Sequence, residues 1–306
     1  MKVLVSGGAG FIGSHLVRQL LDRGDEVIVI DNMSVGNRKN LPIHDNLKVV
    51  VADILDNIGT HFSGVDIVYH LAALTRPQKS IIDPVSTNIV NVNGTIKILE
   101  HCGKKKVKRI VFISTTGIYG TQDSQPIPES ATPRPMCQYA VSKWAGEKYC
   151  ELYNKLYGLE YNIIRPFNVY GERQSPLGGY AAAIPTFIKT LKDGETPHIT
   201  GDGKQSRDFV YVKDVVDLIV RAGNSKINRE IFNVGSGTTT SINQIYNMVA
   251  KIMKKDIKPD YVDPVFEPPM TWGDVFRAER LLGWIPTTKL EEGLELTIDS
   301  MNENSN

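Results

Sequence analysis

The chain has 306 residues, 41% of them hydrophobic, and a formal net charge of +1. Because basic and acidic residues nearly cancel, no strong field favours nucleic acid or an anionic membrane as a partner. The length suffices for one large core or for two unequal lobes. No uninterrupted apolar stretch could span a bilayer, and the apolar run that starts at Lys2 leaves no room for a signal peptide.

The three cysteines, Cys102, Cys137 and Cys150, form an odd and widely spaced set. Disulfide frameworks and metal sites use cysteines that are paired or clustered at short spacing. We therefore expect reduced thiols, no metal and a cytoplasmic location.

The first predicted elements are a strand, a glycine-rich loop and a helix. Residues 2–6 form a short apolar run rich in β-branched residues, which favours a buried parallel strand. Gly7, Gly10 and Gly13 follow at every third position, and residues 11–21 carry apolar side chains at helical spacing. Glycines in this pattern allow a tight turn, close approach to a pyrophosphate and close packing of helix on strand. The N–H groups at the helix start can bind phosphates.

The second predicted strand, residues 26–30, is followed directly by Asp31. A carboxylate at this point accepts hydrogen bonds from both ribose hydroxyls and repels a 2′-phosphate. An unrelated glycine-rich turn would not require the two strands and the acid in this order. The start of the chain therefore predicts a dinucleotide site that prefers NAD over NADP.

Strands and helices continue to alternate along the chain. Further buried strands are expected at residues 47–51, 65–71, 107–113 and 161–165, with helices at residues 81–101 and 138–157. Repeated strand–helix units predict an α/β fold with a Rossmann-type doubly wound parallel sheet, whose ligands bind beyond the carboxyl ends of the strands. Residues of the motifs fall at those ends: Gly7, Asp31, Asp53, Ala72, Thr115 and Asn168.

The pattern changes after Gly171, where glycines and prolines such as Gly178-Gly179 and Pro268-Pro269 break the chain into shorter pieces. We expect an NAD-binding domain over residues 1–171 and a smaller C-terminal α/β substrate-binding lobe over residues 172–306. Residues 230–235 are expected to return to the first domain as one more strand.

Thr115, Tyr139 and Lys143 are the candidate catalytic residues. An ordinary phenol has a pKa of about 10, which is too high for a base at neutral pH. On a helix, Tyr139 and Lys143 lie one turn apart on the same face. The ammonium and the positive ring of oxidised NAD both favour phenolate, which can take a proton from a substrate hydroxyl while hydride leaves the same carbon. The alternative is an ordinary aromatic and a solvated lysine on an amphipathic helix.

These motifs together resemble the extended short-chain dehydrogenase/reductase family, and within it the NAD-dependent nucleotide-sugar epimerases of the UDP-galactose 4-epimerase type. The resemblance runs along nearly the whole chain and includes residues 91–95, 165–171, 207–212 and 282–286. It implies that Thr115, Tyr139 and Lys143 are the catalytic set. It implies cofactor binding by Gly7, Gly10, Phe11, Ile12, Gly13, Asp31, Asn32, Ser34, Gly36, Asp53, Ile54, Leu71, Ala72, Ala73, Asn91, Tyr139, Lys143 and Pro166. It implies substrate contacts from Thr75, Thr115, Thr116, Tyr139, Asn168, Arg207 and Thr271.

The residues after Thr115 discriminate among members of this family. Related 4,6-dehydratases carry Asp-Glu there and decarboxylating relatives carry Glu, whereas this chain has Thr116 and Gly117. These two residues cannot transfer protons for an elimination. The simplest fate of a 4-keto intermediate is then hydride return to the opposite face of the sugar, which is C4 epimerisation.

Two departures from the family pattern concern the substrate. Forms restricted to plain hexoses often carry Tyr at the position of Thr271, so the smaller Thr favours UDP-GlcNAc/UDP-GalNAc, with UDP-glucose/UDP-galactose as a second activity. Thr271 as a packing residue only is the alternative. The usual second diphosphate-binding Arg is absent from residues 263–267, which leaves Arg207 a larger share of that contact.

Other functions stay open at this point: an epimerase of UDP-glucose only, a UDP-uronic acid epimerase, a sugar-nucleotide dehydrogenase or reductase, and a regulator that binds sugar nucleotides without catalysis. The resemblance further implies a homodimer formed through the helices at residues 81–101 and 138–157.

Overall fold

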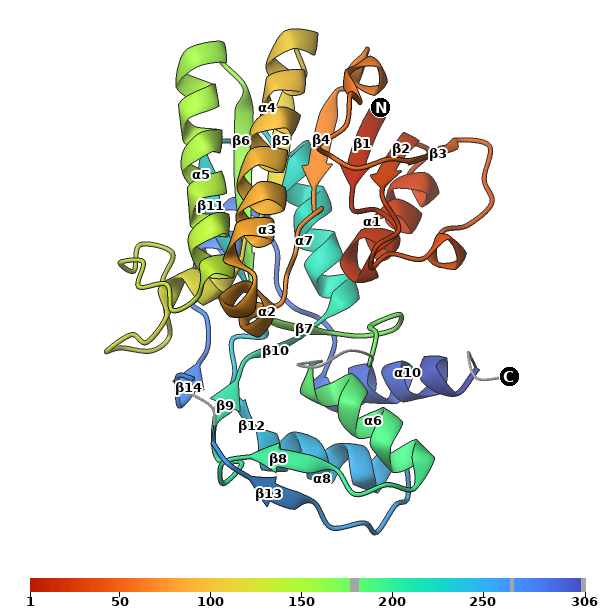
Figure 1. Cartoon of the computed structure of the whole chain (residues 1–306), viewed down its shortest axis with the longest axis vertical. Coiled ribbons are helices and arrows are strands. Elements are labelled where there is room, and N and C mark those ends of the chain that lie inside the picture. Colours follow the sequence, from red (N-terminus) through yellow and green to blue (C-terminus); the bar gives the residue numbers. More distant parts are fainter. Residues whose placement is uncertain (177–181, 265–266, 304–306) are drawn as a thin grey trace.

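The computed structural model describes residues 1–176, 182–264 and 267–303. Its larger part is a seven-stranded sheet with the strand order β11-β6-β5-β4-β1-β2-β3 (Figure 1). In chain order the strands are β1 (Lys2–Ser6), β2 (Glu26–Asp31), β3 (Leu47–Val51), β4 (Ile67–His70), β5 (Arg109–Ile113), β6 (Glu160–Pro166) and β11 (Glu230–Val234). All pairs are parallel. The predicted Rossmann-type doubly wound sheet is therefore confirmed.

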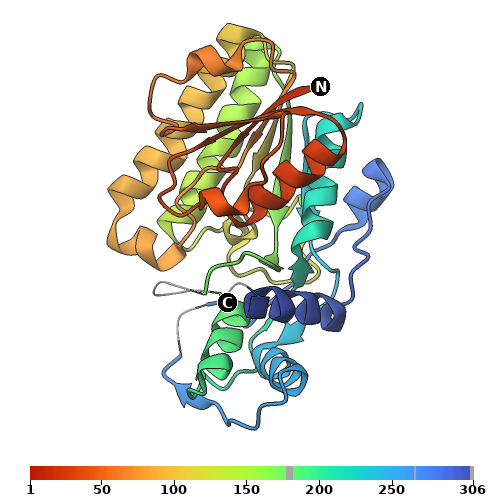
Figure 2. The ribbon, with the colours of Figure 1, turned by 90° about the vertical axis from the view of Figure 1, so that its right-hand side faces the viewer.

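Helices cover both faces of this sheet, which explains why its strands read as continuous apolar runs. One face carries α4 (Gly94–Lys105) and α5 (Gln138–Tyr157), and the other carries α1 (Phe11–Asp22) and α7 (Val212–Asn224) (Figure 2). The central strand β1 shows the result, because Val3, Leu4 and Val5 have no exposed surface. The strand order reverses between β1 and β4, which places the binding crevice at their carboxyl ends.

The helix expected over residues 81–101 is instead broken into several pieces. The structure has α2 (Pro77–Ile82), α3 (Pro84–Asn88) and a π-helical turn (Ile89–Asn93) before α4. Pro84 causes the first break, because a proline disfavours helical geometry in the residue before it. Asp83 accordingly has φ −127° and ψ 76°, and its side chain accepts from Ser86 N at the start of α3.

The smaller part of the molecule lies below the sheet in Figure 1. Its helices are α6 (Ala183–Asp193), α8 (Ile242–Ile252) and α10 (Leu290–Glu303), whereas α9 (Phe276–Leu282) packs against α7 and β11 of the larger part. Its short strands form the pairs β7 (Asn168–Tyr170) with β10 (Phe209–Tyr211) and β8 (His198–Thr200) with β13 (Asp260–Val262), and the set β12 (Thr240–Ser241), β9 (Ser206–Arg207) and β14 (Met270–Thr271). Gly178-Gly179, the expected break, lies outside the described residues.

The chain crosses between the two parts more than once. Residues 172–306, the expected substrate lobe, also supply α7 to one face of the large sheet and β11 to its edge beside β6. The division of the chain at residue 171 stays a prediction. None of the helices in the described ranges has both the length and the apolar character of a membrane span.

Candidate active site

A cavity of about 450 Å³ opens at the carboxyl ends of β1, β2 and β4. The predicted cofactor residues that line it are Gly7, Gly10, Phe11, Ile12, Gly13, Asp31, Asn32, Ser34, Gly36, Ile54, Leu71, Ala72, Ala73, Tyr139, Lys143 and Pro166. Thr75, predicted for the substrate, lines the same cavity. Sequence segments far apart in the chain thus converge at the predicted edge of the sheet.

The glycine loop between β1 and α1 is packed too closely for side chains. Gly7 has φ +73°, and a Cβ there would lie 2.7 Å from the backbone nitrogen of Ala72. A Cβ on Gly13 would lie 2.2 Å from the carbonyl oxygen of Gly7. These approaches bring the first turn of α1 to the cavity, and its N–H groups have no partner within the helix. The loop therefore has the geometry of a pyrophosphate site.

Asp31 ends β2 at the wall of the cavity. Its carboxylate accepts hydrogen bonds from Ala9 N and Met33 N, each at 2.9 Å. A Cβ on Gly36 would lie 2.9 Å from both carboxylate oxygens, so glycine is what the close approach of this loop allows. A fixed negative charge at this point can accept hydrogen bonds from a ribose diol and disfavours a phosphate.

Two predicted cofactor residues do not line this cavity. Asp53 accepts a hydrogen bond from Asn32 Nδ2 at 2.7 Å and so supports the loop that follows β2. Asn91 is almost fully buried, accepts from Leu74 N, and donates to Leu74 O and to Ser142 Oγ. Each residue therefore holds a residue of the cavity wall through hydrogen bonds, Asp53 to Asn32 and Asn91 to Leu74.

The candidate catalytic residues come from two elements. Thr115 follows β5, and its hydroxyl accepts from Gly117 N at the start of a short 3₁₀ helix (Thr116–Tyr119). Tyr139 and Lys143 lie in the first two turns of α5, whose start is held by a hydrogen bond from Tyr139 N to Ser80 Oγ. Lys143 is 2% exposed.

Burial favours the neutral form of both α5 residues. It raises the pKa of Tyr139 to about 12, against the opposing effect of a hydrogen bond with Thr115. It lowers the pKa of Lys143 to about 7, against the opposing charges of Cys150 and Glu147. Both effects favour the neutral phenol of Tyr139 at neutral pH, and a positive charge brought close to the phenol would favour the phenolate.

A second cavity of about 320 Å³ lies in the smaller part of the molecule and includes Asn168 and Arg207, both predicted to bind a substrate diphosphate. The two cavities share two lining residues, Val169 and Gln174. The two cavities are therefore adjacent. Among the described residues that line this second cavity, Arg207 is the only arginine.

Arg207 already has partners within the protein. Its Nη1 donates to Ser206 O at 2.8 Å, and its Nη2 pairs with a carboxylate oxygen of Glu267 at 2.7 Å. Thr271 lies opposite Arg207 in the register of β14 and β9, but it lines neither cavity. Thr116 also lines neither cavity, and its hydroxyl donates to Pro166 O at 3.1 Å.

A known protein family matches the part of the chain that holds these residues. This part includes the glycine loop, the acid after β2 and the Tyr139–Lys143 pair. The model of the NAD dependent epimerase/dehydratase family matches residues 3–235. The chain belongs to this family.

Known family members resemble the whole chain. A UDP-glucose 4-epimerase of Mycolicibacterium smegmatis is 38% identical over 100% of both chains. The structure of a UDP-N-acetylglucosamine 4-epimerase from Methanobrevibacter ruminantium, in complex with UDP-N-acetylmuramic acid, superposes with a TM-score of 0.96 at 34% identity, covering 99% of this chain and 98% of that one. A UDP-glucuronic acid 4-epimerase from Bacillus cereus, in complex with UDP-glucuronic acid and NAD, gives 0.93 at 34% identity, covering 99% and 100%.

The cofactor of this epimerase/dehydratase family protein is NAD, as predicted. The residues present fit that group, because Gly7 and Gly13 leave room only for backbone at the phosphates and Asp31 offers carboxylate oxygens at the ribose. NAD accepts a hydride from a substrate carbon and can return it.

Gln174, which no motif in the sequence predicted, lines both cavities of this family member. Its Nε2 donates to Val169 O at 3.0 Å, and its Oε1 is buried without a hydrogen-bond partner among the described residues. Its place three residues after Gly171, where the resembling segment ends, is the signal that could have found it.

Proposed function

We propose that this protein is a UDP-sugar 4-epimerase, which interconverts the C4 epimers of a UDP-hexose through a transient 4-keto sugar. The observation that carries the proposal is the adjacency of two cavities whose linings share Val169 and Gln174. Tyr139 and Lys143 line the cofactor cavity, and Arg207 lines the other. A UDP-sugar held by its diphosphate at Arg207 would extend its hexose towards Tyr139.

In this proposal, Tyr139 and Thr115 both act at the C4 hydroxyl of the sugar. The Tyr139 phenolate takes that proton as the hydride leaves C4 for NAD, and the Thr115 hydroxyl orients the reacting oxygen. After the keto sugar has turned over, Tyr139 returns the proton to the C4 oxygen as the hydride returns to the other face. Lys143 supplies positive charge beside the phenolate when it is protonated.

The residues after Thr115 support epimerisation over elimination. The Thr116 hydroxyl donates to Pro166 O, and Gly117 has no side chain. Neither residue offers a carboxylate that could remove or add a proton at C5 or C6. The 4-keto sugar would therefore leave by hydride return.

The proposed substrates are UDP-GlcNAc/UDP-GalNAc, with UDP-glucose/UDP-galactose as a second pair. The support is the small side chain of Thr271, at a position where forms restricted to plain hexoses often carry Tyr; Thr271 pairs with Arg207 in the β-sheet register but lines neither cavity. A UDP-N-acetylglucosamine 4-epimerase is among the solved structures that resemble this chain, alongside 4-epimerases of UDP-glucose and UDP-glucuronic acid.

One assay tests both levels of this proposal. Purified protein is incubated without added NAD, separately with UDP-GlcNAc, UDP-glucose and UDP-glucuronic acid, and the C4 epimers are resolved by chromatography. Epimers from UDP-GlcNAc and more slowly from UDP-glucose are expected. Turnover of UDP-glucuronic acid alone would reassign the substrate. Absence of epimers, with NADH that builds up in proportion to product once NAD is added, would indicate a dehydrogenase or reductase instead.

A homodimer is the proposed assembly, formed through the outer surfaces of α2, α3 and α5. Large apolar side chains are exposed on these helices, at Ile81, Ile82, Val85, Val141, Leu152 and Leu156. The helices α3 and α5 pack side by side on the same face of the molecule (Figure 1). Exposed apolar patches of this kind mark protein interfaces.

The oligomeric state tests this assembly. Light scattering coupled to size-exclusion chromatography should give twice the chain mass of 34.0 kDa for the natural protein. Val85→Glu should give the mass of one chain, since it places charge on the patch, while Ile43→Glu, at a 98% exposed residue elsewhere, should leave the dimer intact. A natural protein that runs as one chain would overturn the proposal.

A further inference from the structure

A buried ion pair joins the catalytic helix to the strands beside it. Glu147 is fully buried and lies on α5 one turn beyond Lys143 and two turns beyond Tyr139. Arg165, on β6, holds both carboxylate oxygens, with Nε donating to Oε1 at 2.9 Å and Nη2 donating to Oε2 at 2.6 Å. Ser114 Oγ also donates to Oε1, at 2.5 Å.

These bonds connect every segment that carries a candidate catalytic group. Ser114 immediately precedes Thr115, and Glu147 shares its helix face with Tyr139 and Lys143. Arg165 immediately precedes Pro166, whose carbonyl accepts the hydroxyl of Thr116 and whose side chain lines the cofactor cavity. One carboxylate thus sets how α5 sits against the carboxyl ends of β5 and β6.

We propose that Glu147 and Arg165 are positioning residues, which hold the Tyr139–Lys143 face of α5 in register with Thr115 for proton transfer. This inference rests on the proposed epimerase function. It adds that the three catalytic residues are not sufficient for proton transfer and that the buried ion pair must also hold them in place. A buried ion pair alone is weak evidence for stability, because desolvation offsets the attraction between the charges. Its bond to Ser114 is what ties it to the site.

The same network reaches the smaller part of the molecule. Arg165 Nη1 donates to the hydroxyl of Tyr119 at 3.0 Å, and that hydroxyl donates to Asn233 Oδ1 at 2.7 Å. Asn233 Nδ2 in turn donates to Ile127 O at 2.8 Å and to Asp274 O at 3.2 Å. The positioning pair is therefore linked, by an unbroken path of hydrogen bonds, to the segment that follows Thr271.

Charge gives the pair a second effect on the site. The titratable groups that act on Lys143 are Glu147 and Cys150 from its own helix and His70 from β4. Of these, Glu147 is the carboxylate, and it favours the ammonium form of Lys143. Loss of that negative charge should lower the pKa of Lys143 further.

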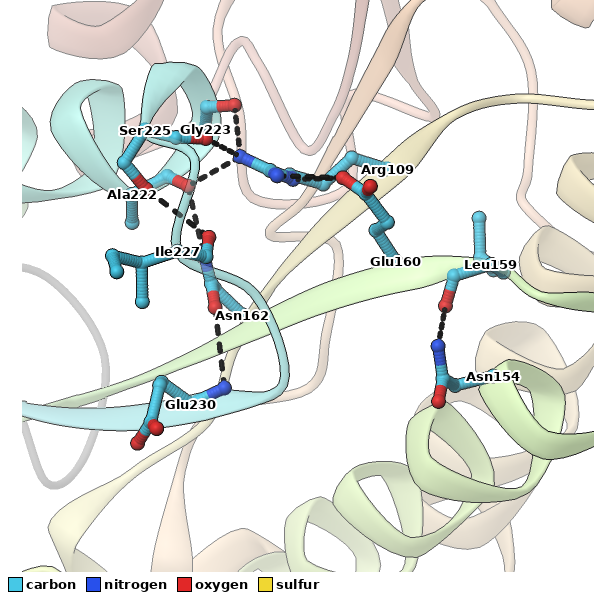
Figure 3. Close-up of polar contacts among 10 residues, drawn as sticks. All are labelled: Arg109, Asn154, Leu159, Glu160, Asn162, Ala222, Gly223, Ser225, Ile227 and Glu230. Atoms are coloured by element: carbon cyan, nitrogen blue, oxygen red, sulfur yellow. Dashed lines mark hydrogen bonds and ion pairs between the residues drawn. The ribbon is translucent and has the colours of Figure 1, made fainter.

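The opposite ends of the same two strands provide a matched control. Arg109 begins β5 and Glu160 begins β6, and the guanidinium donates to Glu160 Oε2 from Nε at 3.0 Å and from Nη2 at 2.6 Å (Figure 3). Nη1 of Arg109 also donates to the carbonyl oxygens of Gly223 and Ser225 (Figure 3). In this pair both donors share one carboxylate oxygen and the Glu160 side chain is 30% exposed, and the pair lies at the end of the sheet away from the cofactor cavity.

The test compares Glu147→Gln and Ser114→Ala with Glu160→Gln in NAD-loaded protein, by thermal melting and by pH profiles of kcat and kcat/KM. A misplacement of about 1 Å costs about 100-fold in rate. Glu147→Gln should therefore lose about 100-fold in kcat and Ser114→Ala about 10-fold. The KM for the UDP-sugar should change less than about 3-fold. In Glu147→Gln the alkaline limb of kcat/KM should move to lower pH.

Glu160→Gln should lose thermal stability with the kcat and the pH profile unchanged. The inference is overturned if Glu147→Gln and Ser114→Ala lose only stability, as Glu160→Gln does. Ser114→Ala decides the question if Glu147→Gln does not fold, because it removes one hydrogen bond and leaves the ion pair in place. Inactivity of the natural protein on every UDP-sugar would be a failure of the proposed function, which is measured first.

Discussion

Arg207 and Glu267 form an ion pair inside the second cavity, with 2.7 Å between Nη2 and a carboxylate oxygen. The guanidinium edge that holds Glu267 is the kind of fork that binds a phosphate through two parallel hydrogen bonds. A substrate diphosphate that binds Arg207 must therefore displace this carboxylate and also overcome its negative charge.

Glu267→Gln should lower the KM for the UDP-sugar about 2- to 5-fold, because an ion pair whose carboxylate side chain is 36% exposed is worth less than about 1 kcal/mol. The kcat should change little, since Glu267 does not contact the reacting carbon in the proposed binding mode. Initial rates over a range of substrate concentrations measure both. Glu291→Gln, at an exposed pair with Lys251, is the control. A raised KM in Glu267→Gln would mean that this carboxylate orients Arg207 for the substrate.

Tyr139→Phe should still bind NAD and the substrate. Its rate of epimerisation should fall about 100- to 10,000-fold, because the phenolate is the proposed base for the C4 hydroxyl. Thr115→Val should be slower by less, since its hydroxyl orients the oxygen and does not carry the proton. Single-turnover kinetics with bound NAD measure both effects. Tyr153→Phe, nearly four turns later on the same helix (at about 3.6 residues per turn), is the matched control, because Tyr153 lines neither cavity. Near-normal turnover by Tyr139→Phe would contradict the proposed role of Tyr139 as the base.

Asp31 should make the protein bind NAD in preference to NADP by about 10- to 100-fold, since hydrogen bonds to a charged group are worth about 1.5–3 kcal/mol. A competition titration of the protein with both cofactors measures the ratio. Asp31→Asn should reduce the preference, because it removes the charge that repels a 2′-phosphate. Equal binding of both cofactors by the natural protein would show that Asp31 does not face the ribose.

Lys143→Met should stabilise the cofactor-free protein while it abolishes activity. Burial lowers the pKa of Lys143 from 10.5 to about 7, so the unfolded chain binds one more proton than the folded protein between these values. The buried lysine therefore lowers the free energy of unfolding most below pH 7, where it must be buried as an ammonium. This destabilisation disappears as the pH rises to 10.5. The gain in free energy of unfolding from Lys143→Met should be about 2–3 kcal/mol larger at pH 6 than at pH 9.

Urea unfolding at the two pH values measures this difference. Lys155→Met, at an exposed lysine near the end of the same helix, is the control and should show no such dependence on pH. An equal gain for Lys143→Met at both pH values would mean that the lysine keeps an ordinary pKa in the folded protein.

Thr271→Tyr should depress turnover of UDP-GlcNAc about 10- to 100-fold relative to UDP-glucose, because overpacking a fitted pocket costs about 1–3 kcal/mol. Rates on both substrates, measured side by side, give the ratio. Met270→Tyr, at the exposed neighbour on the same strand, is the control. An equal fall in turnover of both substrates would indicate that the tyrosine disturbs the fold of the lobe. Unchanged turnover of both would mean that Thr271 lies outside the sugar pocket.

Local sequence patterns were sufficient for the sheet and for the cofactor half of the site. The apolar runs that became β1 and β2, the glycine loop and Asp31 are specified within the first 31 residues, because turn geometry and burial act over short stretches of chain. The spacing of Tyr139 and Lys143 likewise places both on one face of α5, since helical periodicity alone decides that relation. Even the break in the helix expected over residues 81–101 had a local signal in Pro84, which the apolar periodicity masked.

Only the tertiary structure decided which distant charges and cavities meet. Glu147 with Arg165, and Arg207 with Glu267, are 18 and 60 residues apart, and no periodicity in the sequence pairs them. The adjacency of the two cavities at Gln174 and the raised pKa of Tyr139 both depend on how the folded chain packs around these side chains. Local patterns determine the elements because they reflect interactions between near neighbours. The relative placement of the elements determines the charges and the solvent exposure of the site, because these come from residues that the fold alone brings together.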